Sequence, residues 1–264
     1  MTFFDAILLA IVEGITEFLP ISSTGHMAIV SSFLGIEKND FTKLFIENIQ
    51  FGAIISVLVI YWKKFLDFKS WSFYLKLLIA FIPAVIVGLL LKKHIDKILG
   101  EPMFISAVMF LGGILLIFVD NWFKNPMITE EKNISYKRSF IIGIFQLLAI
   151  VLPGFSRSAA TIIGGMQQKL TRKLAAEFSF FLAVPTLAGA FAKSLWDAWK
   201  ENPGLLTHYN LELLILGNII AFVVAIIAIR AFIAYLTKHG FRIFGYYRIL
   251  AGAVLLLLLI LEKK

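Results

Sequence analysis

The segment EGITEFLPISSTGH, residues 13–26, interrupts a strongly apolar N-terminal region, and QLLAIVLPGFSRS, residues 146–158, repeats its plan. In each segment a Glu or Gln lies seven residues before a proline, and a serine lies three residues after that proline. Lipid offers no hydrogen-bond partner to a carboxylate, a guanidinium or an opened backbone. Both segments must therefore face protein or a wet cavity, and together they predict a site built in two halves.

The whole chain has the composition of an integral membrane protein. Of its 264 residues 59% are hydrophobic and only 16% are charged, which is too apolar for an ordinary soluble domain of this length. Crossing about 30 Å of hydrocarbon takes roughly 20 apolar residues of helix. We expect an all-α, polytopic membrane protein with about six transmembrane helices, at residues 46–62, 73–91, 103–122, 174–195, 211–236 and 246–261.

The two polar segments lie in apolar regions, residues 2–34 and 139–169, that are broken near the middle by Pro20 and Pro153. Proline removes a backbone donor and disfavours helix in the residue before it. Each region is therefore predicted to be a re-entrant helix hairpin, which enters the membrane, turns and leaves on the same side. One hairpin and three spans per half give a single membrane domain of two inverted repeats, about 1–125 and 126–264.

The net charge of +8 comes from Lys and Arg residues scattered through short loops, as topology signals are, so nucleic-acid binding is not expected. On the inverted-repeat topology, fifteen of them, Arg248 included, lie at one membrane face and nine, with Lys92 and Lys93 among them, at the other. The positive-inside tendency makes the richer face cytoplasmic and places both termini outside.

Glu13 and Glu17 are four residues apart, so on a helix they share one face and their carboxylates repel each other. A divalent cation held by both carboxylates would offset the repulsion, and so would a proton retained on one of them. The alternative is a solvated surface turn, which the apolar flanks disfavour.

Ser22, Ser23 and Thr24 follow the proline and precede Gly25 and His26, a composition typical of a helix N-terminus that attracts an anion. Ser23 and His26 are three residues apart, so one helical turn can bring hydroxyl and imidazole together, as activation of a nucleophile requires. Two other interpretations stay open, in which the serines are only caps and the histidine is structural.

Arg157 follows a proline and a glycine in the second segment, where its guanidinium offers a bidentate fork that matches phosphate oxygens. Gly154, Ser156, Ser158 and Thr161 are candidate phosphate-binding residues around it. An ion pair with a glutamate of the first segment is the alternative, but it leaves the serines and the glycine unexplained. A hydroxyl, an imidazole, two carboxylates and an arginine together favour phosphoryl transfer.

At these motifs the sequence resembles the undecaprenyl-diphosphate phosphatase family, the bacterial membrane enzymes linked to bacitracin resistance. The glutamate motif of that family matches Glu13 and Glu17, its PGxSRS motif matches residues 153–158, and the resemblance covers essentially the whole chain. It implies hydrolysis of undecaprenyl diphosphate to undecaprenyl phosphate, which recycles the carrier lipid of cell-wall synthesis. It also implies Mg²⁺ or Ca²⁺ as cofactor, the bacterial inner membrane as location and an active site reached from the external face.

The resemblance further implies catalytic roles for Glu17, Ser23, His26 and Arg157. In the preferred mechanism Ser23 attacks the terminal phosphorus, His26 acts as its base and later as an acid, Arg157 clamps the phosphate, and Glu13 with Glu17 holds the metal. In a competing version Glu17 or His26 activates a water, and Ser23 only donates to the phosphate.

The rival from another class is an inverted-repeat transporter of an anionic or lipid substrate. A carrier does not need a serine, a histidine and an arginine grouped as a phosphate site. A second enzymatic alternative is the lipid-phosphate phosphatase superfamily, but no His and Asp follow Arg157 at helical spacing, so its base is missing. The expected partners are the polyprenyl diphosphate and membrane lipid, and a homodimer stays open.

Overall fold

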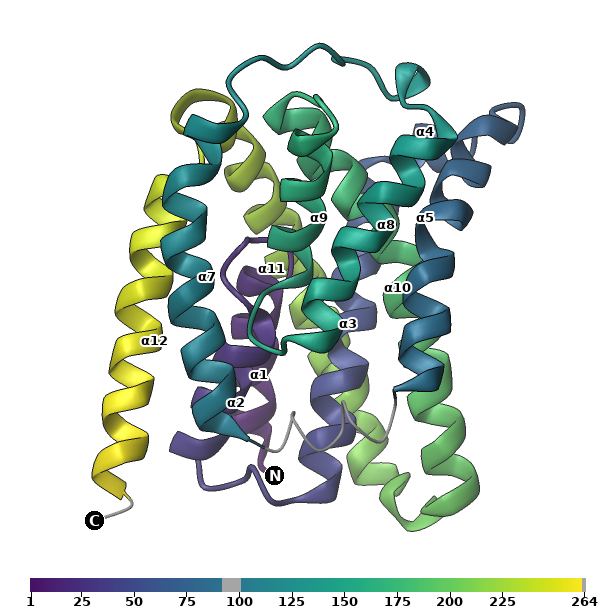
Figure 1. Ribbon diagram of the computed structural model, residues 1–264. Coiled ribbons are helices and arrows are strands. Elements are labelled where there is room, and N and C mark those ends of the chain that lie inside the picture. Colours follow the sequence, from purple (N-terminus) through teal and green to yellow (C-terminus); the bar gives the residue numbers. More distant parts are fainter. Residues whose placement is uncertain (92–100, 263–264) are drawn as a thin grey trace.

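The computed structural model describes residues 1–91 and 101–262, and these residues form the expected all-α fold (Figure 1). In the described ranges the only β contact is an isolated bridge between Ile128 and Leu170. The helices in chain order are α1 (Phe3–Thr16), α2 (Ser23–Phe33), α3 (Asp40–Ile60), α4 (Trp62–Phe65), α5 (Trp71–Leu90), α7 (Pro102–Trp122), η1 (Glu131–Asn133), α8 (Tyr136–Val151), α9 (Arg157–Gln167), α10 (Arg172–Glu201), η2 (Pro203–Leu205), α11 (His208–His239) and α12 (Arg242–Glu262).

Six of the described helices, α3, α5, α7, α10, α11 and α12, are long and apolar enough to cross a membrane. Each overlaps one of the six apolar runs expected from the sequence, which confirms that prediction. The protein is therefore a polytopic integral membrane protein. Helices are the natural spanning structure, because they satisfy every backbone N–H and C=O within the segment.

Helices α1, α2, α8 and α9 are shorter, with 14, 11, 16 and 11 residues, and cannot cross alone a core that takes roughly 20 residues. They form two hairpins that turn just after Pro20 and Pro153. In Figure 1, α1 and α2 extend from the lower end of the molecule, whereas α8 and α9 extend from its upper end. Each hairpin precedes three spanning helices. Re-entry into a bilayer and the two-repeat division near residue 125 stay predictions.

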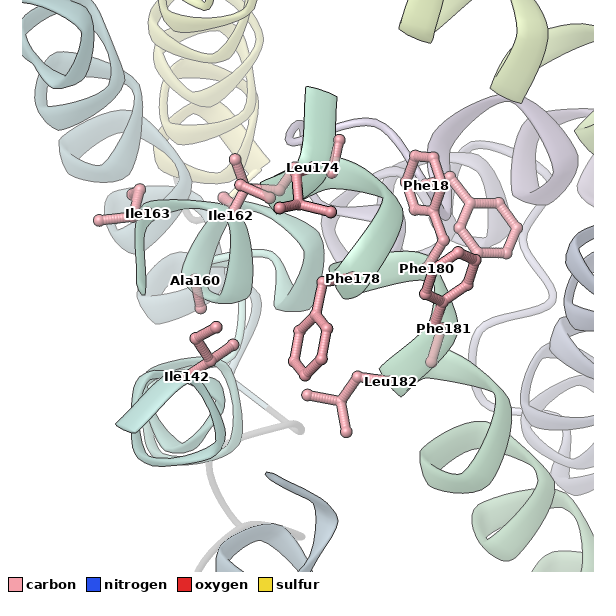
Figure 2. Packing of buried hydrophobic residues seen from close by; sticks show 14 of the residues in the cluster. Phe18, Ile142, Ala160, Ile162, Ile163, Leu174, Phe178, Phe180, Phe181 and Leu182 are labelled. Atoms are coloured by element: carbon pink, nitrogen blue, oxygen red, sulfur yellow. The ribbon is translucent and has the colours of Figure 1, made fainter. Parts of the chain in front are cut away.

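The tip of the first hairpin is held in the larger of two buried apolar clusters in the described part of the chain. Phe18, which is fully buried, packs edge-on against Phe180 of α10 with ring centroids 5.2 Å apart (Figure 2). On the other side of the cluster, Gly143 of α8 lies so close to α5 that a Cβ there would come within 2.2 Å of the Ala80 carbonyl oxygen. Small residues allow such close approach in membranes. Both hairpins are thereby fixed against spanning helices.

The connector between α7 and α8 is fastened at one end of the molecule by a charged cluster. Glu131 accepts from Lys64 at 2.6 Å and from Lys76 at 2.9 Å. Burial alone would raise the pKa of Glu131, but the hydrogen bonds and charges of the two lysines outweigh it, so the pKa lies below its usual value. The carboxylate therefore stays ionised and ties the second half of the chain to α4 and α5.

Candidate active site

The two hairpins turn through the same unusual backbone conformation. Ser22 and Ser156 are the N-caps of α2 and α9, with φ of 72° and 77°, and each hydroxyl accepts a backbone N–H three residues on at 3.2 Å. Positive φ is uncommon outside glycine and is typical of sites where strain is tolerated for function. The two caps are therefore equivalent, and Ser23 and Arg157 occupy the same first helical position in their hairpins.

This equivalence corrects the alignment of the two segments that was based on their prolines. In that alignment Ser23 corresponds to Ser156, whereas in the structure Ser22 does. The second turn has one more residue between its proline and its cap than the first. Gly154 has φ of 97°, and a Cβ there would lie 2.4 Å from the Ile105 carbonyl oxygen. Only glycine fits so close to α7 in this conformation.

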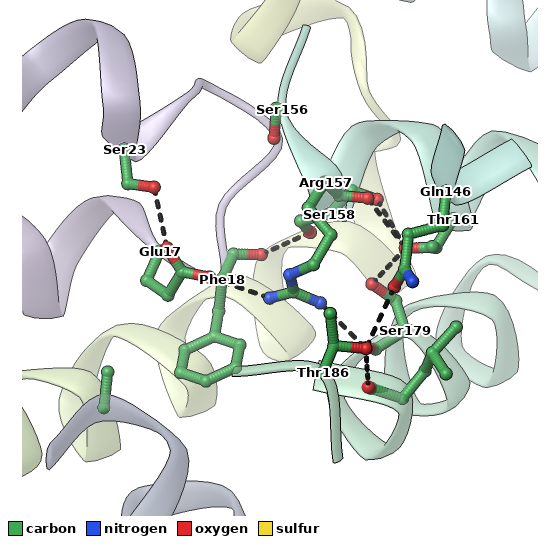
Figure 3. A network of polar contacts seen from close by, with 12 residues as sticks. Glu17, Phe18, Ser23, Gln146, Ser156, Arg157, Ser158, Thr161, Ser179 and Thr186 are labelled. Carbon is green, nitrogen blue, oxygen red and sulfur yellow. Dashed lines mark hydrogen bonds and ion pairs between the residues drawn. The ribbon is translucent and has the colours of Figure 1, made fainter. Parts of the chain in front are cut away.

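Glu17 joins the two hairpins. Its Oε2 accepts a hydrogen bond from the Ser23 hydroxyl at 2.7 Å, and its Oε1 accepts one from Nη2 of Arg157 at 2.9 Å (Figure 3). The side chains of Glu17 and Arg157 are only 5% and 12% exposed, so water screens this pair little. Arg157 also donates through Nη1 to the Ser179 carbonyl at 3.1 Å, while its Nε is buried and has no hydrogen-bond partner. The Nε–H donor of the guanidinium is therefore not used by any protein acceptor in the described ranges.

Most hydroxyls of the other residues predicted to bind phosphate form hydrogen bonds to protein atoms. Ser158 donates to the Phe18 carbonyl at 2.7 Å, so the second hairpin also holds the backbone of the first. Thr161 donates to the Arg157 carbonyl at 2.9 Å and contacts the Ser179 hydroxyl. Ser22 and Ser156 serve as caps, and Thr24 is half-buried beside Ser23. These groups shape the turns that present Ser23 and Arg157.

Glu13 lies one helical turn before Glu17 and is completely buried. Neither of its carboxylate oxygens has a hydrogen-bond partner. A buried, unpaired carboxylate is costly unless a cation or a proton compensates it. Within the described ranges no cluster of three or more Asp, Glu, His or Cys residues could hold a metal ion. Two carboxylates still fit Mg²⁺, which keeps several waters and takes further oxygens from substrate phosphates.

No hydrogen bond joins His26 to the Ser23 hydroxyl, although the spacing predicted that they would meet. Its Nδ1 lies 2.7 Å from the Ser22 carbonyl oxygen, and its Nε2 lies 2.6 Å from the hydroxyl of Tyr247, whose ring stacks on the imidazole. Nδ1 must donate to the carbonyl, so Nε2 accepts from the tyrosine when the ring is neutral. The hydrogen bond of the Ser23 hydroxyl is therefore accepted by Glu17 and not by His26.

Arg248 is a site residue that the sequence interpretation placed at the basic face of the membrane. The structure buries it completely in α12. Its guanidinium donates to four backbone carbonyls, those of Met109 at 3.2 Å, Pro20 at 3.1 Å, Phe155 at 2.7 Å and Gly154 at 2.9 Å. It therefore clamps both turns to each other and to α7. The sequence could have indicated this role, because Arg248 lies just inside an apolar run. An ionisable residue in such a run is a candidate functional residue by default.

Fold and site together define a polytopic membrane protein whose buried polar site is assembled from the tips of two helix hairpins. Comparison with known proteins gives the family. The model of the bacitracin resistance protein BacA family matches residues 6–254, and the chain belongs to this family.

Several curated relatives match nearly end to end, and those described here carry the name undecaprenyl-diphosphatase. The protein of Flavobacterium psychrophilum is 56% identical, over 98% of this chain and 96% of its own. The protein of Porphyromonas gingivalis is 49% identical, over 98% of both chains. The protein of Aquifex aeolicus is 43% identical, over 96% of this chain and 97% of its own.

Proposed function

We propose that this protein hydrolyses undecaprenyl diphosphate to undecaprenyl phosphate and inorganic phosphate, and so recycles the carrier lipid of cell-wall synthesis. The observation that carries the proposal is the carboxylate of Glu17 held between the Ser23 hydroxyl and the Arg157 guanidinium. The names of the relatives support the same reaction. The alternative of a transporter is not favoured, because those relatives are named as diphosphatases.

The geometry supports Glu17, and not His26, as the base. Ser23 gives its proton to Glu17 while its oxygen attacks the terminal phosphorus. The bond from that phosphorus to the bridging oxygen breaks, and undecaprenyl phosphate leaves. Water then attacks the phosphoserine, which frees Ser23 and inorganic phosphate. The Nε of Arg157, which has no hydrogen-bond partner in the structure, then donates to an oxygen of the transferring group, where charge must be stabilised.

Ser23→Ala tests the nucleophile. We expect phosphate release from undecaprenyl diphosphate in detergent to fall about a thousandfold, because the reaction loses its covalent route. Acid quenching of the wild-type reaction should trap phosphoserine at Ser23, detectable by mass spectrometry. Ser31→Ala is the matched control, since this serine of α2 donates only to the helix carbonyls of Met27 and Ala28. A variant that keeps most of its turnover, with no trapped phosphoserine, would assign the attack to water.

Glu13 and Glu17 are the residues that would hold a divalent cation, Mg²⁺ or Ca²⁺. Such an ion supplies positive charge next to the diphosphate. The two unpartnered oxygens of Glu13 support this assignment.

Removing the metal should therefore matter. We expect a chelator to lower phosphate release about a hundredfold, and Glu13→Gln to raise the Mg²⁺ concentration needed for half-maximal activity. Glu37→Gln, in the exposed loop after α2, is the control. Full activity in chelator, with no change for Glu13→Gln, would instead assign Glu13 a retained proton.

We also propose that the two hairpins are re-entrant, that the halves are inverted repeats in the bacterial inner membrane, and that the site is reached from the external face. The opposite directions of the hairpins in Figure 1 and the basic residues of the α4 and η1 end support this orientation. Lys92 and Lys93, counted for the other end, lie outside the described residues. The chain has no cysteine, so a single cysteine at Lys38 should react with an impermeant maleimide added outside cells.

A further inference from the structure

An apolar groove of about 660 Å³ lies between the tip of the first hairpin and helices α11 and α12. Ile15, Leu19 and Ile21 line it from the hairpin, and Ala228 and Ala231 line it from α11. Its volume falls in the range of small-molecule sites. The alanines leave the space that larger side chains would fill.

One wall of the groove is aromatic and interlocked. Phe244 of α12 packs edge-on against Phe232 and Tyr235 of α11, with ring centroids 5.2 Å and 5.7 Å apart. All three rings line the groove. Edge-to-face pairs hold rings in defined positions, so this wall is a fixed surface against which an apolar chain can pack.

The groove lies beside the candidate active site. Tyr247 lines it, and the hydroxyl of the same side chain lies 2.6 Å from Nε2 of His26. Thr16 also lines it, next in the chain to Glu17. Two residues of the groove lining are therefore direct neighbours of active-site residues.

We propose that this groove holds the isoprene units of the substrate nearest the diphosphate, while the diphosphate lies between Ser23 and Arg157. The inference rests on the proposed function. A bulk phospholipid is a poorer occupant, because its headgroup stays at the membrane surface, whereas the groove includes Thr16, the chain neighbour of the buried Glu17.

The direction of the groove fits a lipid held by its head. It follows the C-terminal half of α11, away from the end at which α1 begins (Figure 1). On the proposed orientation that is away from the external face, so a substrate entering head-first from the external leaflet points its tail along the groove. Lipid tails are as apolar as the groove itself, so moving the isoprene chain from the bilayer into the groove gives no gain from the hydrophobic effect. The groove contributes packing contacts and a fixed direction for the chain.

Filling the groove tests the proposal. We expect Ala228→Phe to raise the KM for undecaprenyl diphosphate about tenfold with kcat within twofold, because the added ring occupies groove space and even one methylene in an apolar pocket has an effect of this order. Ala234→Phe is the matched control, on the same helix, exposed and outside the groove lining, and its KM should stay at the wild-type value. Ala231→Phe, at an exposed lining position, replaces Ala228→Phe if that variant does not fold. An unchanged KM in the groove variant would overturn the proposal.

Photo-crosslinking gives an answer that does not depend on turnover. A polyprenyl diphosphate with a diazirine on its second isoprene unit should label residues 224–235 or 243–247 of the wild-type protein. Labelling confined to other helices would overturn the proposal, and so would equal labelling of the groove by a diazirine phospholipid. If the wild type binds and crosslinks the probe there but releases no phosphate from undecaprenyl diphosphate, the proposed function fails while the tail site stands.

Discussion

Arg157→Ala should reduce phosphate release from undecaprenyl diphosphate about a thousandfold, the usual order for loss of an arginine or an oxyanion donor in phosphoryl transfer. The substitution removes the 2.9 Å contact to Glu17 and the free Nε donor. Both losses act on the reacting groups themselves, since one contact holds the proposed base and the other donor serves the transferring phosphate. The loss should therefore appear in kcat, measured as inorganic phosphate released at saturating substrate.

Two further substitutions serve as controls. One tests whether the positive charge alone is enough, and the other tests whether loss of any arginine–carboxylate pair lowers activity. Arg157→Lys keeps the charge but concentrates it on one nitrogen, without the planar fork whose two ends reach Glu17 and Ser179, so most of the loss should remain. Arg172→Ala breaks another arginine–carboxylate pair, the 2.6 Å contact to Asp120 at a partly exposed site, and should leave kcat within about threefold of the wild type. Near-normal release by Arg157→Ala would remove this site from the reaction.

Some parts of the structure could be predicted from the sequence, because a single physical rule determines each of them. Apolar runs of membrane length gave the six long helices. Two prolines inside apolar segments gave the turns. The cost of leaving a charge unpaired in a membrane made an ion pair between Arg157 and a glutamate of the first segment the alternative to a phosphate site, and in the structure Arg157 pairs with Glu17.

The choice of partners within the site depends on backbone geometry that spacing does not reveal. Ser22 takes positive φ, and in the resulting helix start Ser23 reaches back to Glu17 while His26 bonds the Ser22 carbonyl. Three-residue spacing therefore did not make Ser23 and His26 a pair. Nor could spacing show that the second turn is one residue longer, because the extra residue is absorbed at Gly154.

Arg248 was misplaced because the last span was expected to begin at Tyr246, which puts the arginine near the surface. Helix α12 begins instead at Arg242, so Arg248 enters the protein interior. The hydrogen-bond partners of Arg248 are backbone carbonyls, and every residue has one, so the sequence does not show which residues Arg248 contacts. The contact of one side chain with both hairpin turns became visible only in three dimensions.

Arg248→Met should therefore lower the free energy of unfolding by about 3 kcal/mol. The methionine leaves four carbonyl oxygens buried without their donor, at about 1–3 kcal/mol each, and part of this cost is offset because the guanidinium no longer has to be buried. Thermal unfolding in detergent measures the change. Arg230→Met, at an exposed position of α11, is the control and should unfold like the wild type.

The same substitution should lower kcat about a hundredfold below the unfolding temperature, since a misplacement of about 1 Å has effects of this order. Arg248 does not touch the Glu17 pair, so it acts by positioning the two turns that carry Ser23 and Arg157. A lysine reaches fewer carbonyls than the guanidinium, so Arg248→Lys should lie between wild type and Arg248→Met in both stability and kcat. If Arg248→Met were destabilised but kept its full kcat while folded, the clamp would serve stability alone, and the turns would hold their relative position through Glu17 and Ser158.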